Sequence, residues 1–211
     1  MDLGDIRREY ERAMLSRAEL KGDPITQFEA WYRDAEAAQV AEVNAVSLST
    51  VDADGRPTAR TVLVKYFVAD GVVFFTNTGS RKAADIEANP HVCLLFFWQP
   101  LERQVIIRGA AEKVSRAETM RYFARRPRGS QLGAWVSRQS SVISSRQILA
   151  AQLESMRRKF ADGDVPMPDF WSGYRVRPRD VEFWQGGRDR LHDRFLYRRA
   201  ADGWTVDRLA P

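Results

Sequence analysis

The feature of this chain that most restricts its fold is a succession of short runs rich in β-branched and aromatic residues, separated by tight turns. Asp54-Gly55, Asp70-Gly71 and Asp202-Gly203 are dipeptides typical of hairpin turns. The expected strands cover residues 45–51, 58–67, 72–77, 92–98, 104–114, 174–185, 194–199 and 204–209. Many short strands joined by such turns predict an antiparallel barrel rather than an alternating parallel α/β sheet.

Helical patterns accompany these strands. We expect a helical N-terminal segment over 1–44, packed on the barrel, in which Asp23 is the N-cap and Pro24 the first residue of a helix. Shorter helices are expected over 80–88, 115–125 and 145–160. With 211 residues, of which 44% are hydrophobic and 29% charged, the chain suits one soluble domain over 1–211, mainly β with flanking helices.

The positive charge of the chain comes mostly from arginine. The formal net charge is +5, and of 33 basic residues only five are lysine. Because the planar guanidinium matches phosphate and carboxylate oxygens, this composition predicts recognition of anions. Composition alone leaves open whether the anion is a nucleic acid or a phosphorylated small molecule.

Several classes of site are absent from the sequence. Cys93 is the one cysteine, so no intrachain disulfide can form, and its apolar neighbours predict a thiol in the core. Two histidines, His91 and His192, provide no metal-ligand cluster, and neither a GxSxG, a Walker A nor a Rossmann motif occurs. The first ten residues lack an apolar run and no later run could span a bilayer, so we expect a cytoplasmic protein without membrane contact.

Two segments concentrate groups that could bind an anion. Residues 79–82, Gly-Ser-Arg-Lys, follow an expected strand and begin an expected helix, where backbone N–H groups and two cations would converge. Residues 186–195 hold three arginines and His192. If this second segment is extended, Arg190 and His192 share one face and Leu191 turns toward the core. On a regular strand Arg60 and Lys65 would point to opposite faces.

Four polar strings carry a resemblance to a known family. They are Gly-Gly-Arg-Asp-Arg-Leu-His-Asp-Arg-Phe from Gly186, Arg-Gln-Val-Ile-Ile-Arg-Gly from Arg103, Gly-Ala-Trp-Val-Ser-Arg-Gln-Ser-Ser from Gly133, and the C-terminal Trp-Thr-Val-Asp-Arg-Leu-Ala-Pro. Together they resemble pyridoxamine 5'-phosphate oxidases, in the same order from Arg7 to Pro211. The resemblance implies a split barrel that binds flavin mononucleotide (FMN), and a homodimer with FMN at the subunit interface, where strands in 174–211 complete the active site.

The resemblance also implies a reaction. Members of this family oxidise pyridoxamine 5'-phosphate and pyridoxine 5'-phosphate to pyridoxal 5'-phosphate. A hydride passes from C4' to flavin N5, and dioxygen reoxidises the flavin to give hydrogen peroxide. Arg190 and His192 match the catalytic pair nearest the pyridine ring, and which of them acts as a base, if either does, stays open.

The residues that match the family's binding sites fall into two sets. The substrate set is Arg7, Tyr10, Lys65, Tyr122, Arg126, Ser130, Arg190 and His192. The cofactor set is Arg60, Thr61, Val62, Leu63, Val64, Lys65, Phe75, Thr76, Arg81, Lys82, Gln104, Gln139, Ser140, Trp184 and Arg194. Relatives often have tyrosine where Phe75 stands. No metal ligand is implied.

Three other functions fit parts of the sequence. A split-barrel flavoprotein with a different substrate would keep Arg60, Arg81, Lys82 and Gln104 but would not need the substrate set. A non-catalytic module could bind flavin or pyridoxal phosphate. A basic barrel could bind single-stranded nucleic acid, with a steep salt dependence and no bound chromophore.

Overall fold

The computed structural model of the chain describes residues 1, 9–69, 71–136 and 138–211. Arg7, an expected substrate contact, lies outside the described residues, and so does Asp70 of one expected turn. Among the described residues, no helix has both the length and the apolar character needed to cross a membrane.

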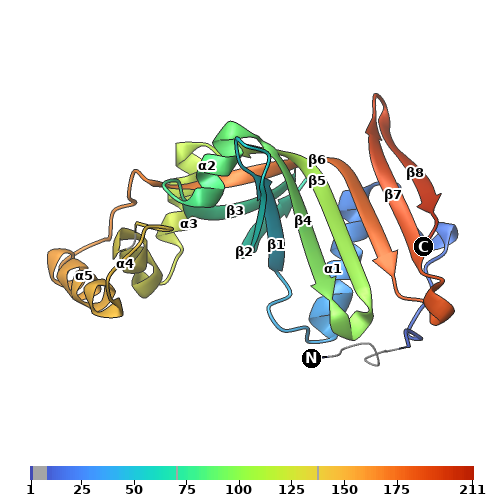
Figure 1. Cartoon of the computed structure of the whole chain (residues 1–211), viewed down its shortest axis with the longest axis horizontal. Coiled ribbons are helices and arrows are strands. Elements are labelled where there is room, and N and C mark those ends of the chain that lie inside the picture. Colours follow the sequence, from blue (N-terminus) through green and yellow to red (C-terminus); the bar gives the residue numbers. More distant parts are fainter. Residues whose placement is uncertain (2–8, 70, 137) are drawn as a thin grey trace.

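Six antiparallel strands close into a barrel, and two more extend one side of it. In chain order the strands are β1 (Ala45–Val51), β2 (Pro57–Val68), β3 (Gly71–Asn77), β4 (His91–Trp98), β5 (Arg103–Lys113), β6 (Trp171–Gln185), β7 (Asp193–Ala200) and β8 (Gly203–Leu209). The sheet order is β3-β2-β1-β4-β5-β6-β7-β8, and pairing of β3 with β6 closes the barrel (Figure 1). The predicted fold, mainly β with flanking helices, is confirmed.

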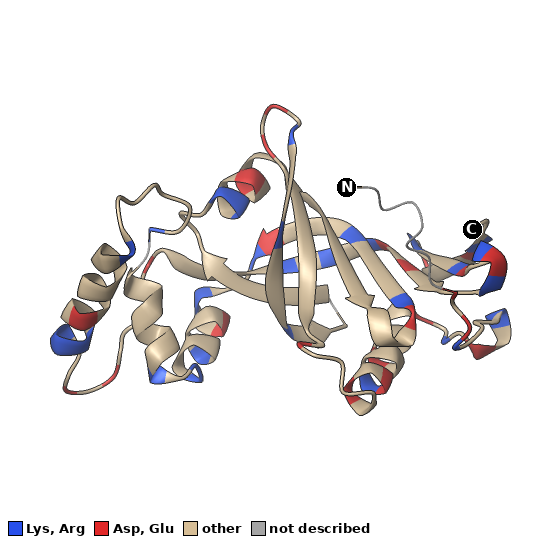
Figure 2. Cartoon of the chain, turned by 60° about the horizontal axis from the view of Figure 1, so that its bottom comes forward, with Lys and Arg blue, Asp and Glu red and all other residues tan. Residues whose placement is uncertain are grey.

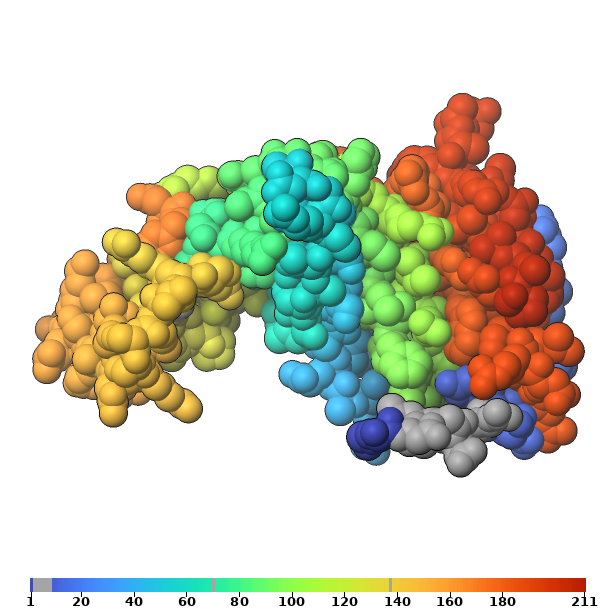
Figure 3. Space-filling model, viewed as in Figure 1, coloured from blue at the N-terminus to red at the C-terminus, as the bar shows by residue number. Residues whose placement is uncertain are grey.

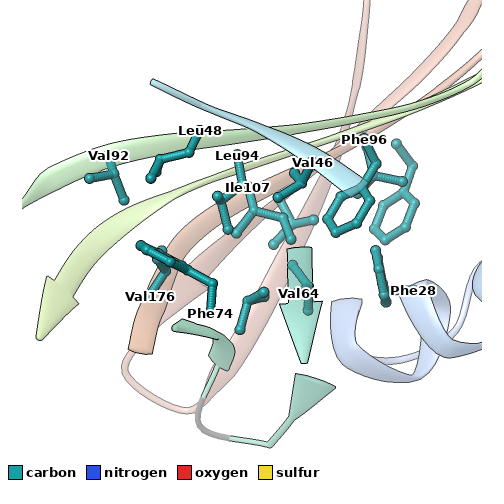
Figure 4. Packing of buried hydrophobic residues seen from close by; sticks show 14 of the residues in the cluster. Phe28, Val46, Leu48, Val64, Phe74, Val92, Leu94, Phe96, Ile107 and Val176 are labelled. Atoms are coloured by element: carbon teal, nitrogen blue, oxygen red, sulfur yellow. The ribbon is translucent and has the colours of Figure 1, made fainter. Parts of the chain in front are cut away.

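The barrel interior is filled by alternate residues of its strands. Leu48, Phe74, Leu94, Ile107 and Val176 are fully buried and point toward one another (Figure 4). Because successive side chains of a strand alternate between its faces, their neighbours form an outward face. Cys93, between buried Val92 and Leu94, is half-buried on that outward face, so its expected place in the core is wrong.

Helix α1 (Pro24–Ala37) covers the barrel beside β4 and β6. Its N-cap Asp23 accepts hydrogen bonds from the backbone of Ile25 and Thr26, as predicted, and Phe28 stacks on Phe67 with ring centroids 3.8 Å apart. The helical segment expected over 1–44 is wrong in extent.

Outside α1, the described residues before β1 include a 3-10 turn at Arg17–Glu19 and no further α-helix. The physical reason is that, outside the turn that Ser16 and Glu19 cap, groups of this stretch bond to other parts of the chain instead of forming helical hydrogen bonds. Leu15 N donates to Asp193, Arg12 N donates to Glu102, and the Arg17 guanidinium donates to the Val206 carbonyl. These bonds tie the N-terminal stretch to the end of the sheet that carries β7 and β8.

Three helices form a separate lobe beside the barrel. They are α3 (Arg116–Ala124), α4 (Arg128–Val136) and α5 (Arg146–Lys159), and they pack around a second small core that includes Phe123, Leu132 and Trp171. Helix α4 replaces the loop expected after Pro127. A hollow separates this lobe from strand β2 (Figure 3). The short helix α2 (Arg81–Ala88) lies against β1 near the same hollow (Figure 1).

Candidate active site

A cavity of about 1130 Å³ lies between the barrel and the helical lobe. It is lined by β2, β3, the first residues of α2, helices α3 and α4, and the loop before α5. The three lobe helices carry more basic than acidic residues (Figure 2). The predicted site residues that line it are Arg60, Thr61, Val62, Leu63, Lys65, Phe75, Thr76, Arg81, Lys82, Tyr122, Arg126, Ser130, Gln139 and Ser140.

Of the predicted site residues on strand β2, all but one line the cavity. Val64 is buried in the barrel core, so its side chain does not reach the cavity. Arg60 and Lys65 both line the cavity, although their spacing places them on opposite faces of a regular strand. The pairing of β2 with β3 shifts register between Val64 and Tyr66, beside Lys65, so the strand is irregular there.

Lys82 is a cation held almost entirely by uncharged groups. Its side chain is buried, with 8% of the residue exposed, and Nζ donates to Thr76 Oγ1 (3.2 Å), Ser80 Oγ (3.2 Å) and Gln139 Oε1 (3.1 Å). None of the ion pairs among the described residues includes Lys82. Burial, and then the charge of Arg60, lowers the pKa of Lys82 to about 8. An anion in the cavity would stabilise the charged form and raise this pKa again.

Two arginines stand beside Lys82. Arg60 is held from the barrel side by Thr50, Thr58 and Asp85, and burial lowers its pKa while Asp85 opposes that effect. Arg81 N donates to Ser140 Oγ at 3.2 Å, which fixes the loop over the first turn of α2. The predicted anion site at this helix start therefore has three cations within one cavity.

A second cationic group lies on the helical lobe. Tyr122 stacks on Phe75 with ring centroids 4.1 Å apart, and the Arg126 guanidinium lies 4.6 Å from the ring centroid of Trp171. Burial raises the pKa of the Tyr122 hydroxyl and lowers that of Arg126. Ser130, expected in a loop, lies in the first turn of α4. Trp171 lines the cavity but was not anticipated, because the expected strand began at residue 174.

The other predicted residues lie elsewhere on the sheet. Gln104, Trp184 and Arg194 are register neighbours on β5, β6 and β7, and Tyr10 and His192 pack on Trp184 with ring centroids 5.7 and 4.6 Å away. Strands β1 and β4 separate β5 from β2, a lateral distance of roughly 14 Å at ordinary strand spacing. A single chain therefore divides the predicted site into a cavity group and a Trp184 group, which comprises Tyr10, Gln104, Trp184, Arg190, His192 and Arg194.

The turn that carries Arg190 and His192 differs from its expected conformation. Residues Arg188–Arg190 form a 3-10 turn in which Asp189 and Arg190 have φ of 54° and 61°. The segment is not extended, and Leu191 is 71% exposed instead of turned toward the core.

His192 has a defined hydrogen-bonding arrangement. Its Nδ1 accepts the Gly187 N–H at 3.1 Å, which leaves Nε2 to carry the proton of the neutral ring. Burial, followed by the charges of Arg190 and Arg194, lowers the pKa of the imidazole. Both effects favour the neutral ring.

The sequence matches two family models that together cover most of the chain. Residues 32–160 match the model described as pyridoxamine 5'-phosphate oxidase, and residues 171–211 match that of the pyridoxine 5'-phosphate oxidase C-terminal dimerisation region. The chain belongs to the pyridoxamine 5'-phosphate oxidase family. The Trp184 group, apart from Tyr10 and Gln104, lies within the dimerisation region of this family.

Full-length relatives and a solved structure agree with this assignment. The chain is 57% identical over 212 residues to the pyridoxine/pyridoxamine 5'-phosphate oxidase of Rippkaea orientalis, with 100% of both chains covered. It is 53% identical over 210 residues to that of Shewanella amazonensis, covering 100% of this chain and 99% of the relative. The crystal structure of PhzG from Burkholderia lata, in complex with tetrahydrophenazine-1-carboxylic acid, superposes with a TM-score of 0.88 at 28% identity, covering 94% of this chain and 98% of that one.

Proposed function

We propose that this chain is an oxidoreductase that uses FMN to oxidise pyridoxine 5'-phosphate and pyridoxamine 5'-phosphate to pyridoxal 5'-phosphate. The observation that carries the proposal is that one cavity holds two cationic groups. The first is Arg60 of β2 with Arg81 and Lys82 at the start of α2, and the second is Arg126 on the helical lobe. FMN and the substrate are both phosphate monoesters, so the reaction needs two anion sites close together.

The cavity fits FMN on chemical grounds. Lys82 is a buried ammonium whose partners are neutral oxygens, and such a cation is stabilised when a phosphate binds beside it. Phe75 offers an aromatic surface beside this cation group, and Thr76 and Gln139 offer hydrogen-bonding groups. When bound, FMN supplies the hydride acceptor for C4' and the route by which electrons pass to dioxygen.

A homodimer would complete the site. The Trp184 group lies outside the cavity, within and around the part of the chain that matches a dimerisation region. On the outward face of the sheet, Leu63 at the cavity is exposed by 39% and Phe97 of β4 by 51%, and a second copy could cover both. We therefore place FMN at the subunit interface, between the cavity of one chain and the Trp184 group of its partner.

Each group of residues then has a distinct task. Lys65, Tyr122, Arg126 and Ser130 bind the substrate phosphate, and Trp184 and Tyr10 supply an apolar wall that limits access of water. Arg190 and His192 orient the pyridine ring so that C4' faces the cofactor, since alignment of the reacting atoms lowers the barrier. Arg194 places positive charge where the reaction develops negative charge.

The test is the visible spectrum of the FMN-loaded protein kept without oxygen, before and after pyridoxine 5'-phosphate is added. Bleaching of the oxidised flavin band, reversed by air, is the expected result. If neither the alcohol nor the amine substrate bleaches the band, the protein acts on a different substrate. A protein that takes up no FMN would contradict the proposal as a whole.

A further inference from the structure

Three positive charges share the α2 end of the cavity, and they disfavour one another. Burial is the main cause that lowers the pKa values of Arg60 and Lys82, and the charge of Arg81 beside Arg60 and of Arg60 beside Lys82 lowers them further. Without a compensating group, mutual repulsion would favour side-chain arrangements in which Arg60 turns away from Lys82. An anion site built from these side chains therefore needs something that keeps Arg60 in place before the anion arrives.

Asp85 is the carboxylate in position to do this. It lies on α2, one turn after Arg81 and Lys82, and is 4% exposed. Its Oδ2 accepts hydrogen bonds from Thr50 Oγ1 at 2.6 Å and Thr58 Oγ1 at 3.0 Å, and it lies 3.5 Å from Arg60 Nη2. Asp85 is not among the residues that line the cavity, so it does not contact a ligand there, and Arg60 is the lining residue with which it pairs.

The two threonines link Arg60 to Asp85 in one direction. Arg60 Nη1 donates to Thr50 Oγ1 at 2.7 Å and to the Leu48 carbonyl at 3.3 Å, and Nη2 donates to Thr58 Oγ1 at 2.5 Å. A guanidinium only donates, a carboxylate only accepts, and a hydroxyl can do both. The two threonine hydroxyls also lie 3.2 Å apart, where either could donate to the other. When both hydroxyls donate to Asp85, each accepts from Arg60, and Asp85 is the final acceptor of the network.

We propose that Asp85 is a positioning residue for phosphate binding: through Thr50 and Thr58 it holds Arg60 beside Lys82 and so preorganises the site for the FMN phosphate. This inference rests on the proposed binding of FMN. Preorganisation strengthens binding because the site need not be rearranged when the ligand enters. Nothing in the family resemblance assigned a role to Asp85, whose signal in the sequence is its position four residues after Arg81.

A simpler electrostatic role would have the opposite consequence. A buried carboxylate beside an anion site repels the anion, so removal of its charge alone would tighten FMN binding. If instead Asp85 mainly positions Arg60, its removal weakens binding although the site becomes more positive. The sign of the change therefore separates the two roles.

The experiment measures FMN and riboflavin binding to flavin-free protein by quenching of flavin fluorescence. For Asp85→Asn we expect roughly tenfold weaker FMN binding and unchanged riboflavin binding, because riboflavin lacks the phosphate. In an Arg60→Met background, Asp85→Asn should cause no further loss, since its effect passes through Arg60. Thr50→Val, which keeps the shape of the side chain and removes the linking hydroxyl, should weaken FMN binding in the same direction.

Asp180→Asn is the matched control. Asp180 is also buried, at 6% exposure, and pairs with Arg108 and Arg179 away from the cavity, so its substitution should leave FMN binding unchanged. Thermal unfolding of each variant verifies that it is folded, and Thr50→Val carries the test if Asp85→Asn does not fold. Unchanged or tighter FMN binding in the variants, or an equal loss of riboflavin, would overturn the inference. Wild-type protein that binds neither ligand would instead contradict the proposed function, and the inference with it.

Discussion

The cavity group and the Trp184 group of this chain are built in different ways. In the cavity, Lys82 has three hydrogen-bond acceptors and Arg60 is tied to Thr50 and Thr58, so the charged groups are fixed by the chain itself. The Arg188–Arg190 turn has two successive non-glycine residues with positive φ, and Leu191 beside it is exposed. Under the proposed function, the phosphate site is prepared within one chain, whereas the Arg188–Arg190 turn would gain its surroundings from a second chain.

The positive φ angles support this division. A left-handed conformation costs a non-glycine residue about 1 kcal/mol or more and persists when surrounding contacts impose it. Two contacts within the chain hold this turn. Leu191 N donates to the Arg188 carbonyl, and the Arg188 guanidinium forms a salt bridge with Glu11 at 3.0 Å. The proposed catalytic role of Arg190 accounts for why the chain keeps this conformation.

The largest expected effect is on turnover, and it comes from Arg190→Ala. We expect a decrease in kcat of roughly 100-fold or more, because the substrate loses a group that aligns C4', while FMN binding stays at the wild-type level. Steady-state kinetics and an FMN titration check the two parts. Arg188→Ala, in the same turn but paired with Glu11, is the control and should keep its turnover. Normal rates in Arg190→Ala would contradict the catalytic role.

Lys82→Ala should show the complementary behaviour. Loss of a buried charged donor to the phosphate is expected to weaken FMN binding by roughly 10- to 100-fold. FMN retained after exhaustive dialysis measures the effect, and Lys113→Ala, an exposed lysine paired with Glu87, is the control. A full complement of FMN in the dialysed variant would show that the phosphate binds elsewhere.

Mixed dimers test whether the two groups belong to one site across an interface. Lys82→Ala and Arg190→Ala chains that are mixed and allowed to exchange form mixed dimers as about half of the population. Each mixed dimer has one site with both substitutions and one with neither. Half of the sites in half of the dimers are then unaltered, so roughly a quarter of the wild-type activity should return at FMN concentrations that load the unaltered site. If both groups served the same chain's site, mixing would restore nothing beyond the average of the two variants.

The strands and turns were predictable from the sequence because they depend on local alternation and on turn residues such as Gly55 and Gly203. Helix α4 was not, since Gly129 and Gly133 weaken its local signal. Its stability comes from tertiary contacts, among them burial of Leu132 and the hydrogen bond from Trp135 to the Pro166 carbonyl.

The cavity residues were identified mainly through resemblance, and their division into two groups could not be inferred locally. That division depends on the spatial order of the strands. In the sheet β1 and β4 lie between β2 and β5, whereas along the chain β3 and β4 lie between them. The proposed role of Asp85 likewise depends on the approach of α2 to Thr50 of β1, a contact between residues 35 positions apart. Long-range contacts of this kind leave no periodic signal in a sequence.

The smallest expected effect concerns pH, and it tests whether the charges of the Trp184 group act on His192. Burial, and then Arg190 and Arg194, lower the pKa of His192 below its ordinary 6.5, so the neutral ring persists into mildly acidic solution. If the neutral form is the active one, kcat/KM should fall only below pH 6.5. Arg190→Gln removes one of these charges, so the pKa of His192 should rise and the acidic limb of the kcat/KM profile should move to higher pH.

The control is Arg188→Gln, which should leave the acidic limb unchanged, because Arg188 is not among the charges that shift the pKa of His192. The pKa of His192, followed directly by NMR, separates this electrostatic effect from the loss of substrate alignment: the same value in wild type and Arg190→Gln would mean that Arg190 acts on the substrate alone.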